Sequence, residues 1–249
     1  MSDKQSYSQK SVTYDLLSSY YKNSNPQLHD YYYHKHLKSL EKSTQQLRYE
    51  QMNVLLPAQI RFLHAAPTAP SFDVYVNEMS ILKNFSYKET NGYLPQPPGK
   101  YQLDIYRRGQ STSPLLSCEV ALESGTSYTI ALAPTLDSES LKMLPFEDNP
   151  TVPPNEAKVR FIQLSPDLLS VDIAVKDGDV VFDRLHFRKA SEYLNIHPMI
   201  VDFEVRIAGT KEIAFPLPNR AFQENTPSTI YIIGSNRQSS SLETLTLSP

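Results

Sequence analysis

An internal repeat constrains the fold of this chain more than any other feature of its sequence. Residues 60–76, IRFLHAAPTAPSFDVYV, align without a gap on residues 159–175, VRFIQLSPDLLSVDIAV. When one residue is added to the second copy, the match continues through three further pairs: Tyr93 with Tyr193, Gly109 with Gly209, and Thr129 with Thr229. Because a match of this length is not expected from chance, we predict two domains of the same fold.

The repeated part of the chain has the periodicity of β-strands. Residues 72–76, 101–105, 116–122 and 128–132 each place apolar side chains at every second position, and Ser124-Gly125 is a typical turn between such runs. We therefore predict a mainly β fold. It consists of two tandem antiparallel β-sandwich domains, immunoglobulin-like or transthyretin-like. Cys118 falls on the inward side of its run, and we expect a core thiol there.

The predicted domains are residues 58–148 and 149–249, preceded by a helical segment over 1–57. The proline-rich stretch EDNPTVPP at 147–154 joins the two sandwiches. Since proline favours an extended and fairly stiff backbone, we expect a rigid, elongated pair.

The first 57 residues hold half of the 16 tyrosines and no glycine. Two helices are predicted, at about 12–22 and 26–50, because Asn23-Ser24-Asn25-Pro26 supplies caps and a helix break. The second helix carries an apolar stripe at helical spacing. Its members are Tyr33, Leu37, Leu40, Thr44 and Leu47.

The tyrosines of this segment lie nearly all round the predicted helices, so a single buried stripe does not cover them. Either they dock onto the sandwiches of the same chain, or they meet a protein partner or a second copy, since tyrosine is favoured at interfaces. The residues predicted to interact are Tyr20, Tyr21, Tyr31, Tyr32, Tyr33, Leu37 and Leu40.

Several motifs are shared with a known family. They are RFLHAAP at 61–67, FDVYV at 72–76, PGKY at 98–101, GTSYTI at 125–130, and, in the second copy, RFIQLSPD at 160–167 with Asp172. Each copy resembles the bacterial domain of unknown function numbered 4397. That resemblance implies tandem β-sandwiches, usually exported or on the cell surface, with no established activity. The helical leader has no counterpart in the resemblance and suggests a protein of the bacterial spore.

Composition excludes several classes of function. A net charge of −3 provides no strong field for nucleic acid, and one cysteine excludes disulfide frameworks and cysteine-based zinc clusters. The seven glycines are too far apart for a dinucleotide fingerprint or a phosphate loop. We expect no cofactor. The N-terminus lacks the apolar core of a signal peptide, and no 18-residue apolar run occurs. We therefore expect synthesis in the cytoplasm, no membrane span, and deposition on a structure such as the spore.

Charged residues that recur in both copies are predicted to be structural. We expect ion pairs of Arg61 with Asp73 and of Arg160 with Asp172, with the carboxylates also accepting N–H groups of the proline-containing turn. His64 and Asp73 could instead form an acid–base or metal pair, but the second copy has Gln163 at the histidine position.

A second histidine cluster lies in the predicted helix. It consists of His29, His34 and His36 with Asp30. Asp30 and His34 are one turn apart and could hold a metal, but two ligands are too few for a site. We expect a solvated or interface helix and no metal.

These observations together predict a non-catalytic structural or protein-interaction protein, within a spore or cell-envelope assembly. It would dock or oligomerise through residues 1–57. The first alternative is a module that binds carbohydrate or cell-wall polysaccharide, for which Tyr75 and Tyr106 are the candidate aromatic residues. The second alternative is an enzyme that uses His64, His186 or His197.

Overall fold

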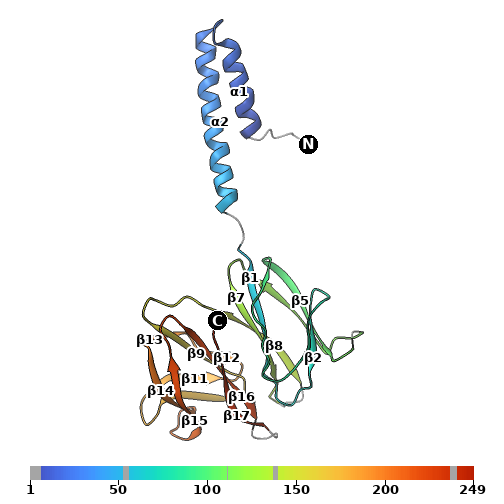
Figure 1. Cartoon of the computed structure of the whole chain (residues 1–249), viewed down its shortest axis with the longest axis vertical. Helices are drawn as coiled ribbons and strands as arrows, with labels where there is room; N and C mark the ends of the chain where they lie inside the picture. The colour runs from blue at the N-terminus through green and yellow to red at the C-terminus, as the bar shows by residue number, and fades with distance from the viewer. Residues whose placement is uncertain (1–6, 53–55, 111, 137–139, 236–239) are drawn as a thin grey trace. The chain divides into compact units, whose positions relative to one another are not determined.

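The computed structural model in Figure 1 describes residues 7–52, 56–110, 112–136, 140–235 and 240–249. The chain divides into two compact units, Met1–Leu55 and Leu56–Pro249. The first unit is helical and the second contains all of the strands, so the mainly β fold preceded by helices is confirmed.

The first unit is an antiparallel helical hairpin (Figure 1). Helix α1 spans Tyr7–Tyr21, and α2 spans Pro26–Met52. The side-chain Oδ1 of Asn25 accepts the N–H of Leu28 at 3.2 Å, and Pro26 occupies the first helical position, where its missing N–H is tolerated. The predicted break between the helices is therefore confirmed. The predicted apolar stripe extends to Leu47, whose side chain lies outside the described residues.

The second unit holds two β-sandwiches with matching strand order (Figure 1). The strands of the first sandwich are β1 (Ala58–His64), β2 (Phe72–Val76), β3 (Met79–Phe85), β4 (Leu94–Gln96), β5 (Gly99–Arg107), β6 (Leu116–Leu122), β7 (Ser127–Pro134) and β8 (Leu141–Asp148). Its two sheets have the orders β4-β1-β7-β8 and β3-β2-β5-β6.

The second sandwich repeats this arrangement. Its strands are β9 (Ala157–Gln163), β10 (Ser170–Val175), β11 (Val180–His186), β12 (Lys189–Ala190), β13 (Leu194–Ile196), β14 (Met199–Ile207), β15 (Ile213–Phe222), β16 (Pro227–Ser235) and β17 (Ser240–Leu247). One sheet has the order β12-β9-β16-β17, with β13 also pairing with β9, and the other has the order β11-β10-β14-β15.

The expectation of purely antiparallel sheets is wrong in one respect. Strand β1 runs parallel to β7, and β9 runs parallel to β16, while the other strand pairs are antiparallel. A parallel pair needs a long crossover connection. Here the intervening strands β2 to β6, and β10 to β15, supply that connection.

Three apolar clusters fill the second unit. One lies inside each sandwich, and the third joins the two sandwiches. The third includes Leu63 and Ala131 of the first sandwich together with Ile162, Leu164 and Tyr231 of the second. As a result, β1, β7, β9 and β16 are buried on both faces, and we call the sheets that contain them the inner sheets.

Cys118 lies in β6 and is half-buried against the core of the first sandwich. Burial raises the pKa of its thiol above the usual value, which disfavours the reactive thiolate. None of the described helices is long and apolar enough to cross a membrane.

Candidate functional site

The seam between α1 and α2 is made of small and polar side chains. Ser11 and Ser18 of α1 are buried, and each faces a histidine of α2. The Nδ1 of His36 lies 3.0 Å from the carbonyl of Ser11, and the Nδ1 of His29 lies 2.9 Å from that of Ser18. Both serines and both histidines are seven residues apart, so the two contacts repeat with the heptad period of packed helices.

Stacked rings extend the seam on one side. Tyr32 of α2 lies between Tyr14 and Tyr21 of α1, with ring centroids 6.3 and 5.8 Å apart. All three tyrosines are half-buried. The inner face of the hairpin therefore consists of serine, histidine and tyrosine, with little aliphatic surface.

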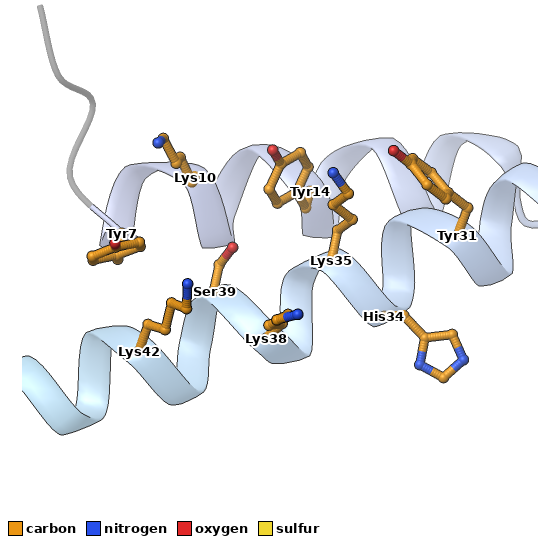
Figure 2. A pocket seen from close by; sticks show the side chains of 9 residues that line it. All are labelled: Tyr7, Lys10, Tyr14, Tyr31, His34, Lys35, Lys38, Ser39 and Lys42. Carbon is orange, nitrogen blue, oxygen red and sulfur yellow. The ribbon is translucent and has the colours of Figure 1, made fainter.

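A groove of about 470 Å³ runs along one side of the hairpin (Figure 2). We call it the Lys–Tyr groove. It is lined by Tyr7, Lys10 and Tyr14 of α1 and by Tyr31, His34, Lys35, Lys38, Ser39 and Lys42 of α2. Four of these side chains are lysines, and none is acidic.

The lysine ammonium groups lie over the tyrosine rings. The Nζ of Lys35 is 5.2 Å from the ring centroid of Tyr31 and 5.8 Å from that of Tyr14, and the Nζ of Lys42 is 5.4 Å from that of Tyr7. The Tyr31 hydroxyl, which is hydrogen-bonded to Lys35, raises the pKa of that lysine above its usual value. The groove is therefore cationic at neutral pH, with aromatic walls.

Large apolar side chains on the hairpin are exposed to solvent. On α1 they are Val12, Leu16 and Tyr20, and on α2 they are Tyr33, Leu37 and Leu40. Leu16 is 66% exposed and Tyr20 is 75% exposed. The hairpin thus buries Ser11, Ser18 and Ser39 and leaves Leu16, Leu37 and Leu40 exposed to solvent.

The predicted interaction residues fall in three places. Tyr31 lines the Lys–Tyr groove, Tyr21 and Tyr32 stack between the helices, and the rest are exposed. The exposed ones are Tyr20, Tyr33, Leu37 and Leu40. The lysines of the groove were not among the predicted residues, although Lys35, Lys38 and Lys42 have the 3- and 4-residue spacing of one helix face.

The histidines of α2 do not gather around a metal. His29 and His36 face α1, whereas His34 lies 4.0 Å from Asp30 and both of these side chains are about three-quarters exposed. Within the described parts of the chain, no three potential ligands come together.

In the sandwiches, the predicted pairs of Arg61 with Asp73 and of Arg160 with Asp172 do not form. Asp73 accepts the backbone N–H groups of Asn84 at 2.8 Å and Gly109 at 3.1 Å. Asp172 does the same with Arg184 and Gly209, both at 2.8 Å. Their acceptor role is as expected, but the N–H groups come from residues with positive φ rather than from the proline-containing turn.

His64 contacts the proline-containing turn instead. It is fully buried, its Nε2 lies 3.2 Å from the carbonyl of Pro70, and its ring stacks on Phe72. In the second copy, Gln163 donates to the carbonyl of Leu168 at 2.6 Å and accepts the N–H of Ser165 at 2.9 Å. His64 and Gln163 thus have the same structural role in their respective copies. The other two candidate histidines, His186 and His197, are exposed.

Both arginines meet at Asp148, in the contact between the sandwiches. Arg160 pairs with its Oδ1, and the Nη2 of Arg61 lies 3.7 Å from its Oδ2. All three side chains are at least 94% buried. Burial and the hydrogen bond to Asp148 raise the pKa of the Tyr93 hydroxyl well above its usual value, so that Tyr93 donates to this carboxylate.

The arginines also reach across the contact reciprocally. Arg61 donates to the carbonyl of Ser248 at 2.7 Å, and Arg160 donates to the carbonyl of Glu147 at 2.6 Å. Glu147 and Ser248 occupy equivalent positions, because Thr129 pairs with Phe146 and Thr229 pairs with Leu247. The arginine of each sandwich therefore binds a backbone carbonyl at the end of the last strand of the other sandwich.

One further groove lies on the sheet β3-β2-β5-β6. It measures about 430 Å³ and is lined by Asp73, Tyr75, Lys83, Asn84, Arg108, Gly109 and Gln110. The rings of Tyr75 and Tyr106 meet edge-on with centroids 4.9 Å apart.

One part of the chain matches a known protein family. Residues 58–174 match the model of a family described as a domain of unknown function (DUF4397), which confirms the resemblance for the first copy. Membership of the second copy stays a prediction. No curated protein matches the sequence significantly.

Among solved structures, the chain is similar to one described as "The Bacillus anthracis TIE protein". The two sequences are 10% identical, and the TM-score is 0.24. The similarity covers 78% of this chain and 44% of that chain, so this chain spans less than half the length of that protein.

Proposed function

We propose that this chain is a non-catalytic structural or protein-interaction protein that docks or oligomerises through its helical hairpin. One observation carries the proposal: the hairpin buries serine and histidine at its seam and exposes Leu16, Leu37 and Leu40. A helix pair that folded only for its own stability would bury those leucines.

Covering the exposed side chains would stabilise a complex. Complete burial of a leucine contributes about 1.5–3 kcal/mol. Tyr20 and Tyr33 add aromatic area and a hydroxyl, which suits an interface that is partly wet. The exposed side chains of α2 also form one continuous face, because Tyr33, Leu37 and Leu40 follow one another at helical spacing.

The sandwiches serve in this proposal as a rigid support. Their contact is apolar and is also held by buried arginines, and both features oppose relative motion. The setting that we propose is a spore or cell-envelope assembly. It is supported by the resemblance to a family of mostly surface proteins and by the exposed apolar side chains of the hairpin.

Capture from the source organism tests this proposal. The full chain and a variant with Leu16→Gln, Leu37→Gln and Leu40→Gln serve as parallel baits for lysate and insoluble fractions. We expect a discrete protein, or the chain itself, to be retained by the full chain and lost from the variant. Because these side chains are exposed, the helical content of the variant should be unchanged.

A control variant carries Leu115→Gln and Ile213→Gln, which change exposed side chains on the sandwiches. It should capture what the full chain captures. Equal capture by all three baits would show that the hairpin is not the docking device.

A second candidate function rests on the groove beside Tyr75. Aromatic rings next to polar side chains suit the stacking and hydrogen bonding of a sugar. In this alternative the first sandwich binds wall polysaccharide, and Tyr75→Ala should lower retention of the chain on purified wall material. The equivalent position in the second copy is Ala174, so the second sandwich would not bind in this way.

A further inference from the structure

The hairpin presents two surfaces of opposite character. The Lys–Tyr groove carries Lys10, Lys35, Lys38 and Lys42 and has no carboxylate among its lining residues. In Figure 2 the side chain of His34, which also lines the groove, lies on the side of α2 that faces away from α1.

The second surface lies on another face of α2. Residues 30, 33, 37 and 40 recur at spacings of three and four, and residue 41 is four positions after residue 37, so all five share one side of the helix. We call this surface the acidic flank. It combines the carboxylates of Asp30 and Glu41 with the exposed apolar side chains of Tyr33, Leu37 and Leu40.

The groove and the flank are separated by helical rotation. Four of the six α2 residues that line the groove are Tyr31, Lys35, Lys38 and Lys42, which also follow a spacing of three and four but start one position later. At about 100° per residue, the two sets lie on different sides of the helix, so one hairpin cannot bring its own flank into its own groove.

We propose that the Lys–Tyr groove of one chain receives the acidic flank of a second copy. This inference rests on the proposed function, and it names the partner. The two surfaces are opposite in charge, because the groove carries four lysines and the flank carries two carboxylates. They also match in apolar character, because the tyrosine rings of the groove meet the leucines of the flank.

A contact between two different surfaces is heterologous, so each copy keeps one surface free for the next. The hairpins then form an open chain of copies, or a ring if the rotation between copies closes. The attraction between exposed charges weakens with salt, so the assembly should shorten as ionic strength rises.

Sedimentation velocity of the full-length protein tests the proposal, over a range of protein concentration and at low and high salt. The groove variant carries Lys35→Glu and Lys38→Glu, and the flank variant carries Asp30→Lys and Glu41→Lys. Each variant alone should weaken self-association at least tenfold. An equimolar mixture should associate again, because the unchanged flank of the groove variant then meets the unchanged groove of the flank variant.

The control carries Lys22→Glu and Lys211→Glu, two exposed lysines outside the groove. It has the same change in net charge as the groove variant and should associate like the natural chain. Circular dichroism should show the same helical content in all variants.

Failure of the mixture to associate, or equal loss in the control, would overturn the proposal. A natural chain that stays monomeric throughout the concentration range would also overturn it. If that monomeric chain still captures a discrete protein through its hairpin, the proposed function stands and only the self-pairing is wrong. If it captures nothing, both fail.

Discussion

At the scale of single residues, the aspartates that recur in both copies, Asp73 and Asp172, stabilise backbone turns. Asp172 is buried, and its two carboxylate oxygens accept the N–H groups of Arg184 and Gly209, which both have positive φ. Each oxygen satisfies an N–H that no strand partner reaches. The repeat predicted a shared structural role, but the partners lie 12 and 37 residues away in sequence, and no local pattern identifies them.

Replacing Asp172 with Ala leaves two N–H groups without their acceptor. We expect the free energy of unfolding to fall by about 2–4 kcal/mol, since a hydrogen bond to a charged group contributes about 1.5–3 kcal/mol and both of these bonds are only part-buried. Chemical denaturation measures the change. Asp179→Ala, at an exposed aspartate of the same sandwich, should change stability by less than about 0.5 kcal/mol. Equal effects of the two substitutions would argue against a special role for Asp172.

The buried imidazole of His64 gives the fold a dependence on pH. Desolvation lowers the pKa of His64 below its usual value of about 6.5, so the folded chain keeps the ring neutral. The unfolded chain takes up a proton first as pH falls, and stability is therefore complete above pH 6.5 and decreases below it.

His64→Gln places the residue of the second copy in the first. Gln163 makes equivalent contacts, so the variant should fold and should lose less stability than the natural chain between pH 7 and pH 5. Denaturant midpoints at several pH values measure this difference. Parallel pH curves for the two proteins would contradict the assignment.

At the scale of elements, the hairpin shows what helical periodicity can and cannot predict. The helical pattern and the Asn23-Ser24-Asn25-Pro26 break predicted the two helices, although α1 begins at Tyr7 and not at about residue 12. The pattern did not predict which residues form the seam between the helices, because the exposed leucines and the buried serines both fit a helical period. The side that meets α1 is chosen by the contacts of His29 and His36 with serine carbonyls, which a pattern of apolar residues does not contain.

Enlarging a seam residue should separate the helices. Ser18→Leu inserts a large side chain at a buried position of the seam, and overpacking of this kind costs about 1–3 kcal/mol. Hydrogen exchange of the α1 and α2 amides should accelerate accordingly. Leu40→Gln, on the exposed side, should leave the exchange rates unchanged. Equal protection in the two variants would place the seam elsewhere.

At the scale of the whole molecule, the two sandwiches share an apolar interface. Strand alternation predicted the strands well, but β7 and β16 are buried on both faces. Their unbroken apolar runs, Ile130 to Ala133 and Ile230 to Ile233, are typical of strands covered on two sides. The location of the charged centre could not be predicted, since Asp148 has no counterpart in the second copy, where Pro249 takes the equivalent position.

Asp148→Asn should destabilise the second unit strongly. It leaves two buried guanidinium groups without a carboxylate, and removing one partner of a buried ion pair costs about 3–5 kcal/mol. Thermal unfolding should show a lower midpoint. Glu147→Gln, at the neighbouring exposed side chain, preserves the carbonyl that Arg160 binds and should leave the midpoint unchanged. A stable Asp148→Asn protein would contradict this role.

The reciprocal arginine contacts relate the two sandwiches in the way that the subunits of a symmetric homodimer are related. Because both sandwiches belong to one chain, their contact is intramolecular, at an effective concentration on the order of millimolar. Dilution should therefore leave the pairing of the sandwiches intact, whereas the association that we propose for the hairpins depends on how much protein is present. The two kinds of contact thus differ in their response to abundance in the cell: the contact between the sandwiches is permanent, whereas the hairpin contact that we propose forms only where the chain accumulates.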